Sequence, residues 1–118
     1  MFFEFDQNNS YGKFDVDDKV CHRLFIEAES EADAICIAEQ LGCYWDGVNS
    51  GIDCPCCGDR WYATPEIVDY KNWGGKTFDN IEEFAQYLAD EYGWTIPDAR
   101  IYYASGKVVE IYSKRHEV

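Results

Sequence analysis

The sequence has few basic side chains and no long apolar run. Ten lysines and arginines stand against 23 aspartates and glutamates, giving a formal net charge of −13 over 118 residues. This charge repels nucleic-acid backbones and anionic membranes at long range, so we do not expect direct binding to either. No stretch approaches the roughly 20 apolar residues of a membrane span, and the start, MFFEFDQNN, lacks the features of a signal peptide. We therefore expect a cytosolic protein.

The length of the chain fits one domain, residues 1–118, and excludes a second domain of ordinary size. Hydrophobic residues make up 47% of the chain and aromatic residues 17%, more than a disordered acidic tail contains. There is no internal repeat, and the three prolines fall between the periodic segments. The composition predicts a compact unit with a real core.

Alternation of apolar and polar residues predicts strands near both ends of the chain. The N-terminal FFEF and residues 19–28 have period-2 character and are expected to pair antiparallel. Residues 100–104 and 107–112 alternate around Ser105 and Gly106, where glycine accepts the positive φ of a tight hairpin turn. Residues 61–62 and 67–70 are candidates for further short strands.

Two segments have helical periodicity. The first runs from an N-cap at Ser30 to a stop at Gly42, and the second begins with Asp79 as its cap and ends at Gly93. Two helices and several strands predict an α+β fold, with both helices packed on one face of a mainly antiparallel sheet of four or more strands. A long central loop, residues 44–78, is rich in cysteine and tryptophan.

Cysteine usage indicates a local metal-binding motif. The six cysteines include adjacent Cys56 and Cys57, and without a signal peptide we expect reduced thiols rather than disulfides. The run Cys54-Pro55-Cys56-Cys57-Gly58 has the C-P-x-C-G form of a zinc knuckle, in which two thiolates face one metal ion.

A tetrahedral zinc site needs more ligands, and the chain has no second C-x-x-C or H-x-x-x-H pair. We predict structural zinc held by Cys54, Cys57, Cys56 and His22. His22 is included because strand alternation places it on an apolar face, where an imidazole needs a bonding partner. Further candidate ligands are Cys21, Cys36, Cys43 and His116. The alternative is that these residues belong to the core and that the motif is only a tight turn.

Sequence motifs for catalysis are missing. The chain contains no phosphate-binding loop, no G-x-S-x-G and no H-E-x-x-H. Asp53 and Asp59 flank the cysteine motif, and negative neighbours raise the pKa of a thiol, which disfavours a nucleophilic cysteine. We therefore predict that the protein is not an enzyme.

Aromatic side chains crowd the central segment. Amphipathic rings beside an arginine can hold a planar, nucleotide-like ligand, with the guanidinium gripping a phosphate or carboxylate. The residues of this alternative ligand site are Tyr44, Trp45, Arg60, Trp61 and Tyr62. The commoner role of such rings in a small domain is core packing.

Acidic residues are unevenly distributed. Residues 1–43 contain ten acids and three bases, and residues 79–98 contain six acids and no base. Acids at helix starts complement the helix dipole, but acids near a helix end have no such role. Carboxylates spread over a surface can imitate a phosphate backbone and occupy a basic groove, although solvated surface is the commoner explanation. The predicted partner-binding residues are Asp15, Asp17, Asp18, Glu82, Glu83, Asp90 and Glu91.

Four phrases, MFFEFDQNNSYGKF, VCHRLFIEAES, LGCYWDG and DCPCCGDRWY, resemble a family of small, acidic, largely uncharacterised proteins of tailed bacteriophages. The likeness covers about the first half of the chain. It implies a phage-encoded protein acting in the cytoplasm of a host bacterium, and it implies no mechanism. By analogy with small acidic phage proteins, we expect an inhibitor or modulator of a bacterial host or defence protein. A nucleotide-sequestering protein and a minor virion component are the alternatives.

Overall fold

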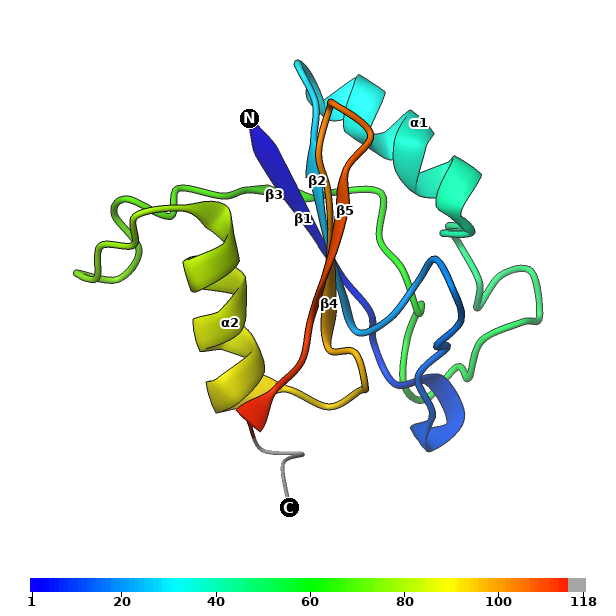
Figure 1. The fold of residues 1–118 in the computed structure, drawn as a ribbon. Coiled ribbons are helices and arrows are strands. Elements are labelled where there is room, and N and C mark those ends of the chain that lie inside the picture. The colour runs from blue at the N-terminus through cyan, green and yellow to red at the C-terminus, as the bar shows by residue number, and fades with distance from the viewer. Residues whose placement is uncertain (115–118) are drawn as a thin grey trace.

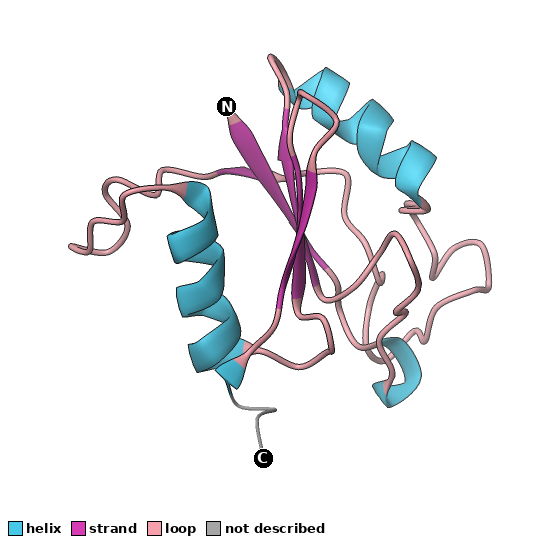
Figure 2. Cartoon of the chain, viewed as in Figure 1, coloured by secondary structure: helices cyan, strands magenta, loops and turns pink. Residues whose placement is uncertain are grey.

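The computed structural model describes residues 1–114 and contains a five-stranded sheet with a helix on each side (Figure 1). The strands are β1 (Phe2–Asp6), β2 (Arg23–Glu27), β3 (Glu66–Ile67), β4 (Ala99–Tyr102) and β5 (Val108–Ile111). The helices are α1 (Glu31–Leu41), α2 (Ile81–Tyr92) and a short 3-10 helix, η1 (Ser10–Gly12). The predicted α+β class is confirmed, and loops account for much of the remaining chain (Figure 2). None of the helices in the described part of the chain is long and apolar enough to span a bilayer.

The strand order is β3-β1-β2-β4-β5. β1 pairs antiparallel with β2 and β3, and β4 pairs antiparallel with β5, as the sequence predicted for the two hairpin-like pairs. β2 and β4 are parallel neighbours in the middle of the sheet. A parallel pair requires a long crossover, and here α1, the central segment and α2 all lie between the two strands in sequence.

The two helices lie on opposite faces of the sheet, and this corrects the prediction that they share one face (Figure 1). Leu24 and Ile26 pack with the buried side of α1, whereas Phe25, between them, packs with α2. Three consecutive apolar residues in one strand make both faces of that strand hydrophobic. Each face therefore needs its own helical cover.

Side-chain caps define where the helices begin. The Ser30 side chain accepts a hydrogen bond from the Asp33 N–H, and Gly42 closes α1 with a φ of 117°. Both features were predicted. In α2 the cap is Asn80 and not Asp79, because the Asn80 side chain accepts the Glu83 N–H.

The second strand begins later than the alternation predicted. Asp17 Oδ1 accepts the backbone N–H groups of Lys19 and Val20, each at 2.8 Å, and so closes a turn over residues 17–20. Pairing with β1 then starts at Arg23, opposite Asp6. The end of β1 and the starts of β2 and β4 therefore meet at one end of the sheet, hereafter the β1-end.

Candidate binding site

The cysteine motif forms an exposed turn held to the N-terminal loop. The N–H groups of Cys57 and Gly58 donate to the Cys54 carbonyl, and Asn8 Nδ2 donates to the Cys57 carbonyl at 2.6 Å. A hydrogen bond from the Cys57 side chain, followed by backbone N–H groups, lowers the pKa of the Cys54 thiol. Cys56 and Cys57 are exposed, and all six cysteines are free thiols.

The structure does not bring His22 to the cysteine turn. Its Nδ1 atom lies 3.0 Å from Asp98 Oδ1, at the β1-end of the sheet. Across residues 1–114, no three cysteine, histidine or acidic side chains gather in a group that fits a metal ion. Cys21 and Cys43 are buried, and burial raises the pKa of each thiol to about 12. His116 lies outside the described residues.

The Arg60 guanidinium bonds groups of the protein itself and is not available to a ligand. Its Nη1 donates to Gln7 Oε1 at 2.9 Å and to the Lys13 carbonyl at 2.7 Å, and its Nε lies 3.2 Å from Asp15 Oδ2. The guanidinium is buried, and its backbone N–H donates to Asp53 at 2.7 Å. Its donors are committed to the protein itself.

The predicted aromatic platform is not formed. Trp61 is 1% exposed and belongs to the core on the α1 side. Tyr44 donates its hydroxyl proton to Asp53, and Trp45 stacks on Phe5. Tyr62 remains exposed, but Trp61 and Arg60 are buried, so they do not form the predicted ligand site with it. Trp61 is instead one of the largest fully buried side chains of the core.

The seven predicted partner-binding acids do not form one face. Residues 13–20, with Asp15, Asp17 and Asp18, lie on the α1 side of the sheet, whereas α2 lies on the other side (Figure 1). The chain segments next to the two groups meet at the β1-end, where the rings of Phe14 and Trp94 pack together.

Three of the α2 acids also have structural partners. Glu82 accepts the Tyr103 hydroxyl at 2.6 Å, and Glu83 accepts the N–H of Asp79. Asp90 accepts from Gln86 and from the N–H of Lys114. These hydrogen bonds leave the carboxylates with lone pairs toward solvent, because a carboxylate accepts up to about four.

Positive charge is largely hidden inside the protein. Arg23, Arg60 and Arg100 are 7%, 7% and 4% exposed, and each is paired with acids. The described arginines therefore contribute little to the outer surface, where the described cations are lysines. Of the described acids, only Asp53 and Asp98 are buried. The exposed charges of the described residues are therefore predominantly acidic.

A buried cluster around Asp98 organises the β1-end. Asp98 is fully buried, and it accepts Arg23 Nη1 at 2.8 Å, His22 Nδ1 at 3.0 Å and the Trp94 N–H at 2.8 Å. Burial opposes ionisation, but the hydrogen bonds from His22 and Trp94 and the charge of Arg23 together lower the pKa of Asp98. Asp98 is not among the predicted site residues, because nothing in the local sequence IPDAR indicates a buried carboxylate.

A pocket of about 250 Å³ opens beside this cluster. It is lined by Gln7, Asn8, Asn9, Phe14, His22 and Trp94. Phe14 and Trp94 are nearly parallel, with an interplanar angle of 20° and ring centroids 6.5 Å apart. Trp94 is 65% exposed, whereas His22 is 7% exposed and sits against the edge of Phe14. The pocket thus combines aromatic walls with a buried imidazole.

One protein-family model, described as a domain of unknown function (DUF7296), matches residues 1–117. The chain belongs to this family. No curated protein and no solved structure matches it. The family description names no activity.

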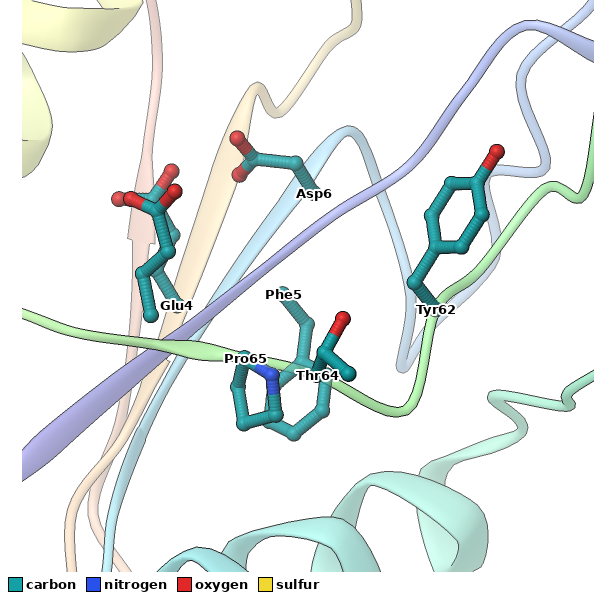
Figure 3. Close-up of a pocket in the computed structure, with 7 residues that line it drawn as sticks. Glu4, Phe5, Asp6, Tyr62, Thr64 and Pro65 are labelled. Atoms are coloured by element: carbon teal, nitrogen blue, oxygen red, sulfur yellow. The ribbon is translucent and has the colours of Figure 1, made fainter.

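A second pocket in this member of the DUF7296 family is built on carboxylates. Glu4 and Asp6 project from one side of β1 and Phe5 from the other, and Tyr62 flanks the opening (Figure 3). Burial, then a hydrogen bond and the charge of Asp6, raises the pKa of Glu4 to about 10. Glu4 therefore carries a proton at neutral pH and adds no negative charge to the surface.

Proposed function

We propose that the protein is a non-enzymatic, phage-encoded inhibitor that occupies a basic, nucleic-acid-binding surface of a bacterial host or defence protein. The observation that carries this proposal is the segregation of charge, with described arginines inside and acids outside. Such a surface repels nucleic acid and attracts a basic protein surface. The resemblance of the sequence phrases supports the bacteriophage setting, in which we expect the partner to be a protein of the bacterial cytoplasm.

The pocket lined by Phe14, His22 and Trp94 is better suited to binding than to catalysis. His22 and Asp98 have the arrangement of a base and its orienting carboxylate, which in an enzyme serves a nucleophile. The described residues that line the pocket carry amide, aromatic and imidazole groups, and none of them is a serine, threonine or cysteine. The hydroxyl of Thr95, which follows Trp94 in the chain, donates to the Pro97 carbonyl at 2.7 Å.

The acids of α2 and of residues 15–18 are the contact groups in this proposal. Neither α2 nor α1 contains a lysine or arginine. Asp90 and Glu91 lie at the C-terminal end of α2, where the helix dipole disfavours negative charge. Acids in that position are electrostatically unfavourable for folding, and a basic partner offsets this repulsion.

Affinity capture from bacterial lysate tests the proposal. We expect the immobilised protein to retain a basic, nucleic-acid-binding protein at about 0.05 M salt, to release it at about 0.5 M, and to lose it to added competitor nucleic acid. The double substitution Glu83→Lys with Glu91→Lys should weaken capture more than Glu29→Lys with Glu31→Lys, which makes the same charge change beside α1. If the amount of retained partner does not depend on salt or on competitor nucleic acid, the result contradicts the proposal.

A further inference from the structure

The cysteine turn, residues 54–58, holds two thiols together on the surface. The Cys57 N–H donates to the Cys54 carbonyl at 3.2 Å, as in a four-residue turn, and Pro55 occupies the second position, where its fixed φ favours that conformation. Such turns bring the first and fourth Cα atoms within about 7 Å, and a disulfide joins Cα atoms about 4.4–6.8 Å apart. The Cys57 side chain also hydrogen-bonds Cys54. The turn therefore has the span of a disulfide between these two residues.

The third cysteine of the turn is placed differently. Cys56 and Cys57 are joined by a trans peptide, so their Cα atoms lie about 3.8 Å apart, below the usual span of a disulfide. Toward the sulfur of Cys54, Cys56 presents its backbone N–H, whereas Cys57 presents its side chain. The geometry thus selects Cys54 and Cys57 as the pair.

Two hydrogen bonds attach the turn to the N-terminal loop. Ser10 Oγ accepts the Cys54 N–H at 2.8 Å, and Asn8 Nδ2 donates to the Cys57 carbonyl at 2.6 Å. Ser10 is fully buried, so the first residue of the turn is fixed to the interior of the protein. Both bonds use backbone groups of the turn, and neither uses a sulfur atom. The fold holds the sulfurs together before any bond joins them, which lowers the entropic cost of forming that bond.

The acids that flank the turn are bonded to other groups. Asp53 is buried, and its carboxylate accepts a tyrosine hydroxyl at 2.8 Å and a backbone N–H at 2.7 Å. The Asp59 carboxylate accepts a backbone N–H at 2.9 Å. The sequence predicts that these acids disfavour a reactive thiol, but in the structure the Cys54 sulfur receives hydrogen bonds from Cys57 and from backbone N–H groups. These hydrogen bonds favour the thiolate, which is the form that attacks a disulfide.

We propose that Cys54 and Cys57 form a reversible disulfide by exchange with a low-molecular-weight disulfide of the glutathione class, a reaction that does not depend on the proposed function. The Cys54 thiolate attacks one sulfur of the small disulfide, which forms a mixed disulfide and releases one thiolate. The Cys57 thiolate then attacks the Cys54 sulfur, closes the internal bond and releases the second thiolate. Together the two cysteines lose two electrons and two protons, and the small disulfide gains them as two thiols.

The short span makes this bond reversible rather than structural. A disulfide between residues three positions apart closes a very short loop, so it constrains the unfolded chain little. Exposed disulfides are also the ones that small thiols reduce readily. Cys57 is exposed, which gives a small thiol access to the bond. Reduction therefore restores the dithiol turn without unfolding the protein.

Redox equilibration of the full chain tests the proposal. The protein is equilibrated with mixtures of reduced and oxidised glutathione in the presence of a chelator, quenched, alkylated in urea and analysed by mass spectrometry. We expect all six cysteines to be alkylated after reducing mixtures, and two fewer, with Cys54 linked to Cys57, after oxidising ones. Half-oxidation should need about tenfold less oxidised glutathione in the folded chain than in the urea-unfolded chain, because the fold holds the sulfurs together.

Serine variants identify the pair, and all three replaced side chains are exposed, so each variant should fold. Cys57→Ser should stop at the mixed disulfide and retain glutathione on Cys54, whereas Cys56→Ser should form the same internal bond as the native chain. Cys36→Ser, in α1, is the control expected to leave the half-oxidation point unchanged. Loss of the internal bond in Cys56→Ser, or equal half-oxidation points for folded and unfolded chains, overturns the assignment. Glutathione on several exposed cysteines without an internal bond also overturns it.

Discussion

At the scale of single residues, the surroundings of the cysteines decide their reactivity. Cys54 sits on the surface turn with a lowered thiol pKa, because its sulfur accepts a hydrogen bond from Cys57 and others from backbone N–H groups. Cys21 and Cys43 lie in the core, where burial favours the protonated thiol and raises its pKa to about 12. A thiolate is the reactive form of cysteine.

We expect iodoacetamide at neutral pH to modify Cys54 first and to leave Cys21 and Cys43 intact until the protein unfolds. Mass mapping of the alkylated peptides measures the order, and Cys36, exposed on α1, is the comparison. Bound zinc at the turn remains a prediction, and in its presence Cys54 is protected until a chelator is added. Rapid alkylation of Cys21 in the folded protein contradicts this order.

Glu4 has the opposite environment for an acid. Its carboxyl is nearly buried beside Asp6, and its pKa rises from 4.5 to about 10. The folded protein therefore holds a proton that the unfolded chain releases above about pH 4.5, and the contribution of Glu4 to stability falls as pH rises from there toward 10.

The isosteric change Glu4→Gln removes this proton uptake while keeping a donor for Asp6. The variant should be more stable than the native chain by about 1–3 kcal/mol at pH 8, and the difference should vanish near pH 4.5. Urea unfolding across this pH range measures it, with Glu29→Gln, a change at an exposed acid outside this pocket, as the control. A native chain that is the more stable at pH 8 overturns the assignment.

At the scale of elements, the start of α2 depends on one side chain. Asn80 Oδ1 accepts the Glu83 N–H at 2.9 Å, whereas Asp79 offers only its backbone N–H, which donates to Glu83 Oε2. Asn80→Ala should lower the free energy of unfolding by about 1 kcal/mol, and Asp79→Ala should change it little. Chemical denaturation of the two variants distinguishes them, and equal losses contradict the cap.

The parallel pairing of β2 and β4 is secured by Asp98 at the β1-end. Its backbone carbonyl accepts the Arg23 N–H at 3.0 Å, and its carboxylate accepts the Arg23 guanidinium. Removing the carboxylate leaves a buried guanidinium without its closest partner.

Asp98→Ala should therefore lower the free energy of unfolding by about 3–5 kcal/mol. Glu110→Ala removes the partner of Arg100 in the same way, but this carboxylate is 43% exposed and Arg100 also donates to the carbonyls of Asp17 and Val20. The control should cost about 1 kcal/mol or less. Comparable losses in the two variants contradict the role of Asp98.

At the scale of the whole molecule, the surface charge opposes folding. Acids cover both helical sides of the sheet, and described arginines are inside, so the compact state brings like charges together. Salt screens this repulsion over a distance of about 10 Å at 0.1 M.

Sodium chloride should raise the thermal midpoint of unfolding, by about 2–5 °C between about 0.01 and about 0.2 M. Calorimetry measures the shift. The double substitution Glu29→Lys with Glu31→Lys should reduce the shift, because it makes the net charge less negative. A midpoint that falls as salt increases in this range shows that buried ion pairs outweigh surface repulsion.

The local elements of this protein follow from the order of its amino acids. Ser30, Gly42, the periodic stripe of α2 and the turn at Gly106 act through neighbours a few residues away, so their structure follows from the chain order. The α+β class follows from the number and type of such segments. The acidic character is likewise a property of composition alone.

The way those elements face one another follows only from long-range packing. In the folded protein, α1 and α2 lie on opposite faces of the sheet, and Arg60 and Trp61 are buried. His22 contacts Asp98 and not the cysteine turn for which it was predicted. The fold also joins Phe14 to Trp94 across 80 positions of sequence. These contacts depend on long-range packing, because each buried polar group takes whichever partner the completed core brings within reach, and local sequence patterns carry no record of that choice.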